Sequence, residues 1–211
     1  FGELMTAGRT PVIELNSSYG QSLIRDVVTT ANDGTVTDVN GEIRLRTSAT
    51  ANGSAQLESA GVGRYIPGYG AQLGIGIRIP TAPTGNQVLT WGGHTVDEND
   101  AFYFGQDSGG VYVARKSGGT ELNKTYQSSW NIDKLDGTGT SDITLDVSDG
   151  NIFQIEFTWY GYGQILFGVL GVTNNQQTFI PCHSLRVTGG TSIQSPNLNV
   201  FANADNGGDT S

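Results

Sequence analysis

The stretch NIFQIEFTWYGYGQILFGV, residues 151–169, alternates apolar with other residues on both sides of a glycine-rich turn. Successive side chains of a β-strand point to opposite faces, so this alternation indicates two strands. The predicted apolar face carries Phe153, Ile155, Phe157, Trp159, Ile165, Phe167 and Val169. The opposite face of the first strand carries Gln154, Glu156, Thr158 and Tyr160. The stretch therefore predicts a β-hairpin that presents one face to a core.

Short runs of the same kind recur along the chain. In AFYFGQDSGGVYVAR, residues 101–115, phenylalanine and valine alternate with tyrosine around a second glycine turn. The runs are separated by glycine, asparagine and aspartate, and 31 glycines against 6 prolines suit a fold with many turns. We expect an all-β fold, a two-sheet antiparallel β-sandwich of the jelly-roll, concanavalin A-like kind.

The length of the chain fits one domain. With 211 residues, of which 36% are hydrophobic, it is long enough for a single sizeable core. We expect one β-sandwich domain over residues 1–200 and a flexible C-terminal tail over residues 201–211 that leads into a further segment. The chain begins at Phe1 rather than at methionine, which is typical of a processed protein or of a piece of a longer one.

The charge and the cysteine content of the chain limit the kinds of partner and bound group that we expect. The formal net charge of -9 disfavours binding to nucleic acid or to an anionic membrane surface. No apolar stretch is long enough to span a bilayer, so we expect no membrane insertion. Cys182 is the single cysteine, and only His94 and His183 are available beside it, which leaves no disulfide within the chain and no zinc set. We expect no cofactor, and we interpret Cys182 as a small buried hydrophobe.

The loop SSWNIDKLDGTGTS, residues 128–141, combines one tryptophan with asparagine, aspartate and glycine. Asparagine and aspartate side chains fold a backbone back on itself through hydrogen bonds, and glycine adopts positive φ angles. Large aromatic rings are mostly buried in proteins. We expect this loop to be ordered, with Trp130, Asn131, Asp133 and Asp136 as its structural anchors.

A second loop, VDENDAF, gathers the carboxylates of Asp97, Glu98 and Asp100. Carboxylate oxygens are the ligands that calcium prefers, but the spacing of an EF-hand loop is absent. Acidic surface loops are also common in a chain of this charge. The three residues are the calcium candidates of the sequence, with solvation as the alternative.

Two tyrosines flank the central glycine of the WYGYG turn. Alternation directs Phe157, Trp159 and Phe167 toward the core and leaves Tyr160 and Tyr162 near a turn that Gly161 and Gly163 open. These two tyrosines are the candidates for contact with a partner protein or a glycan.

Catalysis has weak support in the sequence. Several carbohydrate-active enzymes use a concanavalin-like jelly roll, and retaining glycosidases need two carboxylates about 5 Å apart. The predicted polar face of residues 154–158 offers Glu156 alone. There is no GxSxG turn for a serine nucleophile, and adjacent Cys182 and His183 on a strand point to opposite faces. We expect a protein that is not an enzyme.

The order of several blocks resembles a known group of proteins. The blocks are RTPVIELNSSYG, GRYIPGYGAQLGIGIR, NDAFYFGQDSGGVYVAR, YQSSWNIDKLDGTGTSDITLD, IFQIEFTWYGYGQILFGV and SPNL. Together, from Arg9 to Leu198, they resemble a recurrent group of virion structural proteins of tailed double-stranded-DNA phages, notably cyanophages and other marine phages. The chain departs from the group after PNL, where Asn199 stands in place of a frequent proline.

The resemblance implies a virion component, a capsid-attached fibre or knob or a tail-associated protein, with a role in host attachment. Its implied partners are other virion proteins, and copies in a particle are normally symmetric, so a homo-oligomer such as a trimer is expected. The alternative from another class is a carbohydrate-binding, concanavalin-like module that recognises a host-surface glycan. The two are compatible, since a fibre can bind host sugar.

Overall fold

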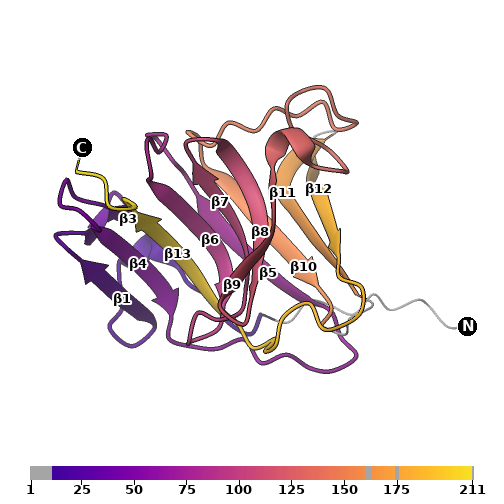
Figure 1. Cartoon of the computed structure of the whole chain (residues 1–211), viewed down its shortest axis with the longest axis horizontal. Helices are drawn as coiled ribbons and strands as arrows, with labels where there is room; N and C mark the ends of the chain where they lie inside the picture. The colour runs from indigo at the N-terminus through magenta and orange to yellow at the C-terminus, as the bar shows by residue number, and fades with distance from the viewer. Residues whose placement is uncertain (1–10, 160–162, 174–175, 211) are drawn as a thin grey trace, which may run out of the picture.

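The computed structural model describes residues 11–159, 163–173 and 176–210 (Figure 1). Its strands are β1 (Asp26–Ala31), β2 (Thr35–Val39), β3 (Glu42–Arg46), β4 (Ser54–Ser59), β5 (Ala71–Ile77), β6 (Val88–His94), β7 (Ala101–Asp107), β8 (Gly110–Ser117), β9 (Thr120–Tyr126), β10 (Asn151–Phe157), β11 (Gln164–Thr173), β12 (Gln176–Arg186) and β13 (Asn199–Asp205). Two short 3-10 helices are η1 (Ser17–Tyr19) and η2 (Gln127–Ser129). Within the described ranges, no helix has the length and apolar character needed to cross a membrane.

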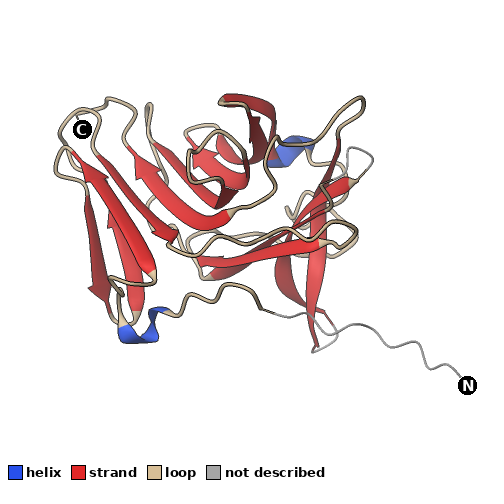
Figure 2. Ribbon diagram, turned by 90° about the horizontal axis from the view of Figure 1, so that it is seen from below, coloured by secondary structure: helices blue, strands red, loops and turns tan. Residues whose placement is uncertain are grey.

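The described strands form three antiparallel sheets. A seven-stranded sheet has the order β1-β4-β13-β6-β7-β8-β9, a four-stranded sheet has the order β12-β11-β10-β5, and β2 pairs with β3 alone. The two larger sheets lie face to face, and loops join their strands at both ends (Figure 2). The predicted fold class, an all-β two-sheet antiparallel sandwich, is confirmed.

The hairpin predicted at residues 151–169 is the pair β10 and β11. Phe157 lies opposite Ile165, Ile155 opposite Phe167, and Phe153 opposite Val169. All six side chains are buried in one cluster. The alternation of the sequence therefore identified both the hairpin and the face that it presents to the core.

Aromatic rings from the two larger sheets meet in this core. The ring of Phe104 on β7 lies 4.9 Å from that of Phe153 and 5.4 Å from that of Phe167. The ring of Phe102, two residues before Phe104, lies 4.9 Å from that of Phe157. Burying a phenylalanine stabilises a fold by about 1.5–3 kcal/mol, so these contacts between layers are the main attachment of one sheet to the other.

The C-terminal end of the chain corrects the expected tail boundary at residue 201. Residues Asn199–Asp205 form β13, which lies in the middle of the seven-stranded sheet between β4 and β6. Phe201 and Ala204 are buried there. The polar composition of this end placed the tail boundary too early, because Asn203 and Asp205 lie on the face of β13 that points away from the core, in register with Thr90 and Val88.

One residue of β10 is more buried than its pattern predicts. Gln154 was placed by alternation on a solvent-facing side, yet only 4% of it is exposed. Its neighbours across the sheet are Gly74 and Gly168, and the ring of Phe179 lies directly over Gly168. Two glycines thus leave room for a ring from β12 to lie beside the amide and shield it.

Candidate functional site

The outer face of the seven-stranded sheet, which points away from the four-stranded sheet, carries a second set of aromatic side chains. Strand alternation places Tyr103 and Tyr112 there, opposite the core residues of β7 and β8. They form a buried cluster of their own, which consists of Ala101, Tyr103, Tyr112, Ala114 and Phe201, with Tyr126 packed against it. We call this surface the outer face.

Register brings residues from four strands into one row on the outer face. Glu58 of β4 lies opposite Phe201 of β13, Phe201 lies opposite Gly92 of β6, and Gly92 lies opposite Tyr103 of β7. Cross-strand neighbours in an antiparallel sheet have their Cβ atoms about 5 Å apart. Along this row the Glu58 carboxylate comes first, followed by the Phe201 ring, Gly92 and the Tyr103 ring.

Glu58 is held by a histidine. Its Oε2 lies 2.6 Å from Nε2 of His94, and the side chains are 14% and 4% exposed. The His94 ring stacks on Phe201 with centroids 4.1 Å apart. In the described residues Oε1 of Glu58 makes no hydrogen bond, which leaves one carboxylate oxygen with acceptor capacity in a fixed orientation.

A second carboxylate contacts the same cluster from β9. The hydroxyl of Tyr103 donates a hydrogen bond to Oε2 of Glu121. Burial, and then this carboxylate, raise the pKa of Tyr103 far above its ordinary value. The Tyr103 hydroxyl therefore stays protonated at physiological pH and acts as a donor.

The third polar group of the outer face is a network around Asp107. Its Oδ2 accepts hydrogen bonds from Nζ of Lys124 at 2.8 Å and from the hydroxyl of Tyr126 at 2.9 Å. Burial alone raises the pKa of the Asp107 carboxyl, but the bonds from Lys124, Gly109 and Tyr126 lower it overall. Nζ of Lys124 also lies 4.0 Å from the centre of the Tyr112 ring, a cation–π distance. The Lys124 ammonium and the Asp107 carboxylate therefore compensate each other's charge.

Two glycines shape the floor of the outer face. A Cβ at Gly105 would lie 2.3 Å from Cζ of Tyr112, so the tyrosine ring lies flat on the strand only because residue 105 has no side chain. Gly92 has a φ of +154°, and a Cβ there would lie 2.4 Å from the carbonyl oxygen of Phe102. Both positions require glycine.

The outer face combines aromatic rings with carboxylates, a lysine and a tyrosine hydroxyl. The Tyr103, Tyr112 and Phe201 rings are buried, so the groups that a ligand can reach are the polar ones, and these suit hydrogen bonding to hydroxyl groups. In the part of the chain that the structure describes, no group of three or more histidine, cysteine, aspartate or glutamate side chains is placed to hold a metal ion.

Comparisons with known proteins concern the fold. No protein-family model matches the sequence, and no curated protein matches it. A protein of unknown function from Shewanella oneidensis MR-1 is similar in structure, with a TM-score of 0.52 at 11% identity, over 94% of this chain and 77% of that one. The metal-free carbohydrate recognition domain of Emp46p has a TM-score of 0.50 at 10% identity, over 94% and 92%. The chain has a concanavalin A-like jelly-roll fold.

A legume lectin-like domain from Entamoeba histolytica is also similar, with a TM-score of 0.45 at 13% identity, over 89% of this chain and 84% of that one. At such identities the likeness concerns the fold and not the chemistry of a site. The role of each residue of this concanavalin A-like domain therefore depends on its own contacts.

The loop predicted to be ordered is held by the four predicted residues. Trp130 is 3% exposed, and its Nε1 donates to the carbonyl of Thr125 at 3.2 Å. Asn131 joins the loop to β12, since its Oδ1 accepts from the backbone N–H of Ser184 and its Nδ2 donates to the Ser184 carbonyl. Asp136 accepts from the backbone N–H and the hydroxyl of Thr138. These three residues therefore tie the loop to itself, to β9 and to β12.

Asp133 is the most buried carboxylate of this loop, with 3% exposed. Oδ1 accepts from the backbone N–H of Leu135 and Oδ2 from that of Ser141, each at 2.9 Å. Burial by itself raises the pKa of the Asp133 carboxyl, but these backbone bonds outweigh it and lower the pKa. A Cβ at Gly139 would lie 2.0 Å from Oδ1, so the glycine-rich part of the loop closes tightly around the carboxylate.

Cys182 and Trp130 belong to the same buried core cluster. The thiol is fully buried, donates to the carbonyl of Phe167 at 3.3 Å, and has a pKa raised by burial. His183 accepts a hydrogen bond at Nδ1 from the backbone N–H of Asn131, and burial lowers its pKa, so it is neutral. Both residues serve packing and loop attachment.

The three acidic residues of the loop at 96–102 do not converge. Asp100 is 4% exposed and accepts from the backbone N–H groups of Gly118, Gln194 and Ser195. Asp97 binds Thr95 and Asn99 within its own turn. Glu98 accepts from Nε2 of Gln56 at the rim of the outer face. Each carboxylate has its own protein partner, and Asp100 ties three loops together.

The predicted contact residues Tyr160 and Tyr162 lie outside the described residues. At Trp159, the last described residue before this gap, the backbone N–H donates to the Tyr65 hydroxyl, which itself donates to the carbonyl of Tyr69. Glu156, considered for hydrolysis, accepts from Nε2 of Gln154 on the far side of the four-stranded sheet. It shares no face with Glu58.

Sequence reasoning found part of the outer face and missed the rest. The alternation in residues 101–115 separates Tyr103 and Tyr112 from the core residues, which is a readable signal. Glu58, His94 and Phe201 come from distant strands, and no local pattern connects them. Their meeting depends on β13 entering the sheet between β4 and β6.

Proposed function

We propose that this domain is a carbohydrate-binding module whose outer face recognises neutral, hydroxylated glycans. The observation that carries the proposal is the Glu58 carboxylate, fixed by His94 beside the Phe201 ring with one oxygen unoccupied. Sugar hydroxyls donate hydrogen bonds to carboxylates. The Phe201 ring is itself buried, so its part is to hold His94 and Glu58 in place. Further support comes from the Emp46p carbohydrate recognition domain, which has a similar fold.

The chemistry of the outer face favours neutral over anionic sugars. Glu58, Glu121 and Asp107 all lie on it, and carboxylates repel the uronate or sulfate groups of acidic glycans. Lys124 supplies a donor among these acceptors, because its ammonium group has three hydrogens and gives one to Asp107. A glycan with free hydroxyls along one edge of its rings meets both kinds of group.

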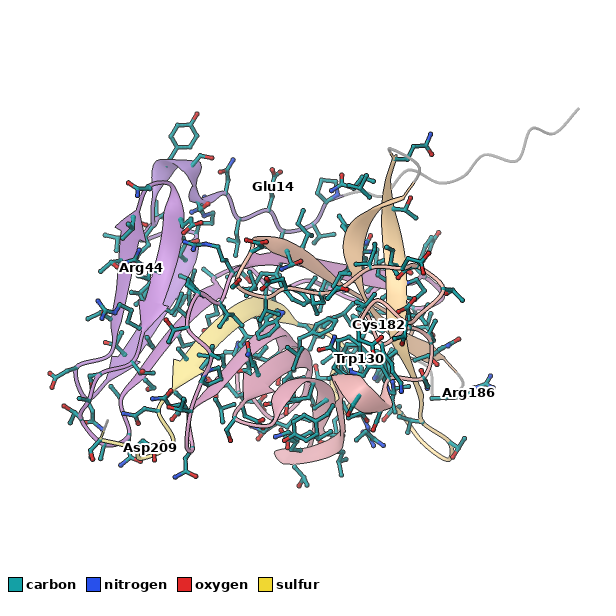
Figure 3. The ribbon with its side chains drawn as sticks, turned by 90° about the horizontal axis from the view of Figure 1, so that it is seen from above. Glu14, Arg44, Trp130, Cys182, Arg186 and Asp209 are labelled. Atoms are coloured by element: carbon teal, nitrogen blue, oxygen red, sulfur yellow. The ribbon has the colours of Figure 1, made fainter. Side chains whose placement is uncertain are left out.

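A glycan array followed by titration calorimetry tests the proposal. We expect binding of the wild-type chain to neutral glycans to weaken at least about tenfold in Glu58→Gln, because a hydrogen bond to a charged group contributes about 1.5–3 kcal/mol. Glu14→Gln is the matched control, since Glu14 is exposed and lies on an extended segment away from the outer face (Figure 3). Equal melting temperatures of the two variants exclude unfolding as the cause.

An array on which the wild-type chain binds no glycan above background contradicts the proposal. Equal binding by wild type and Glu58→Gln contradicts the assignment of the site. The module is proposed to bind without cleaving, so incubation with the bound glycan releases no reducing sugar. Release that disappears in Glu156→Gln would point to hydrolysis instead.

A second proposal, compatible with the first, is that the module belongs to a phage virion. It rests on the order of sequence blocks from Arg9 to Leu198 that resembles virion proteins of tailed phages. Mass spectrometry of purified particles from a phage that encodes this chain is expected to detect it in multiple copies per particle. Its absence from intact particles would leave a glycan-binding module with no virion role.

A further inference from the structure

The layer that faces the seven-stranded sheet has a gap. In the described residues, β5 pairs only with β10, and β3 pairs only with β2, so each has one free edge. A cleft of about 1270 Å³ lies between them, lined by both strands and by the inner face of β4, β6 and β13. Free strand edges carry backbone N–H and C=O groups that are available to another chain. We call this space the β3–β5 cleft.

The floor and walls of the β3–β5 cleft are apolar. Leu57, Leu89 and Ala202 lie on its floor, and they are only partly buried, although the same sheet is fully covered further along. Ile43 and Leu45 line one wall, and Ile75 and Ile77 line the other. Each partly buried aliphatic side chain retains surface whose burial by a ligand is favourable by about 25 cal/mol per Å².

The chain's own N-terminal segment shows what kind of chain suits this cleft. Residues 11–16 run past the cleft without belonging to a helix or a strand (Figure 3). Ile13 and Leu15 line the cleft and are half-buried, whereas Val12 and Glu14 are exposed. An aliphatic residue at every second position, with an acidic residue between, is therefore already tolerated at one side of the cleft.

The cleft has a small excess of positive charge in an acidic protein of net charge -9. Its charged lining consists of four arginines, Arg25, Arg44, Arg46 and Arg78, and three carboxylates, Asp26, Glu42 and Asp205. Arg25 is paired with Asp26, and Arg78 joins the two walls through Glu42 at 2.6 Å. Arg44 and Arg46 make no ion pair within the described residues. Both are exposed on β3 and available to an acidic partner.

We propose that the β3–β5 cleft binds an extended segment of a partner protein in which aliphatic residues alternate with acidic ones. The free edges supply backbone hydrogen bonds, as in β-strand addition. Aliphatic side chains on one face of the segment pack on Leu57 and Leu89, and carboxylates on the other face pair with Arg44 and Arg46. A glycan lacks the aliphatic groups that the floor requires.

A labelled heptapeptide that alternates glutamate with valine tests this inference, because β5 is seven residues long. Fluorescence anisotropy with the full chain is expected to detect its binding, and the same peptide with lysine for glutamate is expected to bind at least about tenfold more weakly. Bound peptide is expected to slow amide hydrogen exchange in β3 and β5. Raising the salt concentration is expected to weaken binding, since exposed ion pairs are screened.

The variant Arg44→Glu with Arg46→Glu is expected to weaken binding of the acidic peptide at least about tenfold. Arg186→Glu is the matched control, since this exposed arginine lies at the opposite end of the molecule from Arg44 (Figure 3). Glu58→Gln is expected to bind the peptide as wild type does, so failure of the glycan proposal and failure of this one are distinguishable.

Three kinds of result would overturn the inference. The first is binding that does not depend on charge, seen either as equal binding of acidic and basic peptides or as binding unchanged by reversal of Arg44 and Arg46. The second is exchange protection outside β3 and β5, for example at β1. The third is self-association of the chain that the double reversal abolishes while the peptide does not bind, which would make a second copy the occupant.

Discussion

We expect Trp130→Ala to lower the free energy of unfolding by about 3–5 kcal/mol, the usual cost of truncating a buried tryptophan. The side chain is 3% exposed and belongs to the main core cluster. Its ring meets Phe104 edge-on at 6.3 Å, and its Nε1 donates to the carbonyl of Thr125. Alanine leaves a cavity and an unpaired carbonyl together. Urea unfolding followed by circular dichroism measures the change.

Two variants separate the contributions of Trp130. Trp130→Phe keeps most of the ring and loses the hydrogen bond, so its cost is expected to fall below that of alanine. Tyr19→Ala removes an aromatic side chain that is 93% exposed, and its effect is expected within about 0.5 kcal/mol of zero. A cost of less than 1 kcal/mol for Trp130→Ala would contradict the assignment of this residue as a core anchor.

Most of the core could be predicted from alternation, because period-two patterns report directly which face of a strand is buried. This holds for Phe153, Ile155 and Phe157 on β10 and for Phe102 and Phe104 on β7. The loop anchored by Trp130 was also predictable, since asparagine, aspartate and glycine have local reasons to fold a backbone. Both predictions depend on interactions between residues that are close in the sequence.

The outer face was harder to predict for the opposite reason. Glu58 on β4 and His94 on β6 are 36 residues apart in sequence. They meet because β13, a strand near the C-terminus, pairs with both β4 and β6 and so places the two strands in one sheet. Gln154 shows the same limit, since its burial depends on the ring of Phe179 reaching over Gly168 from another strand. Alternation states which face a residue occupies but not what covers that face.

Asp100 shows how sequence chemistry admits two interpretations. Three carboxylates in seven residues suit a cation, yet the same oxygens accept backbone N–H groups equally well. In the structure Asp100 accepts three such bonds, from a turn at Gly118 and from the loop at Gln194 and Ser195. The partners come from segments 18 to 95 residues away, which a local motif does not reveal.

We expect Asp133→Asn to lower the free energy of unfolding by about 2–3 kcal/mol at pH 7. The amide keeps one acceptor for the N–H of Leu135 but turns an NH2 group toward the N–H of Ser141, so a buried backbone donor loses its partner. Asp149→Asn, an exposed position, is the matched control and is expected to change the free energy by less than about 0.5 kcal/mol.

The pH dependence of this variant follows from the lowered pKa of the Asp133 carboxyl. Its pKa in the folded chain lies below the unfolded value of about 3.9, so its contribution to stability is fully present above that value and is lost as the pH falls through the folded pKa. The difference in unfolding free energy between wild type and Asp133→Asn is therefore expected to be constant from about pH 5 to 7 and to shrink below about pH 4. Urea titrations at pH 7, 5, 4 and 3 measure it. A difference that stays unchanged at pH 3 would mean that the neutral carboxyl satisfies the loop as well as the carboxylate does, and that burial rather than charge makes Asp133 the centre of this loop.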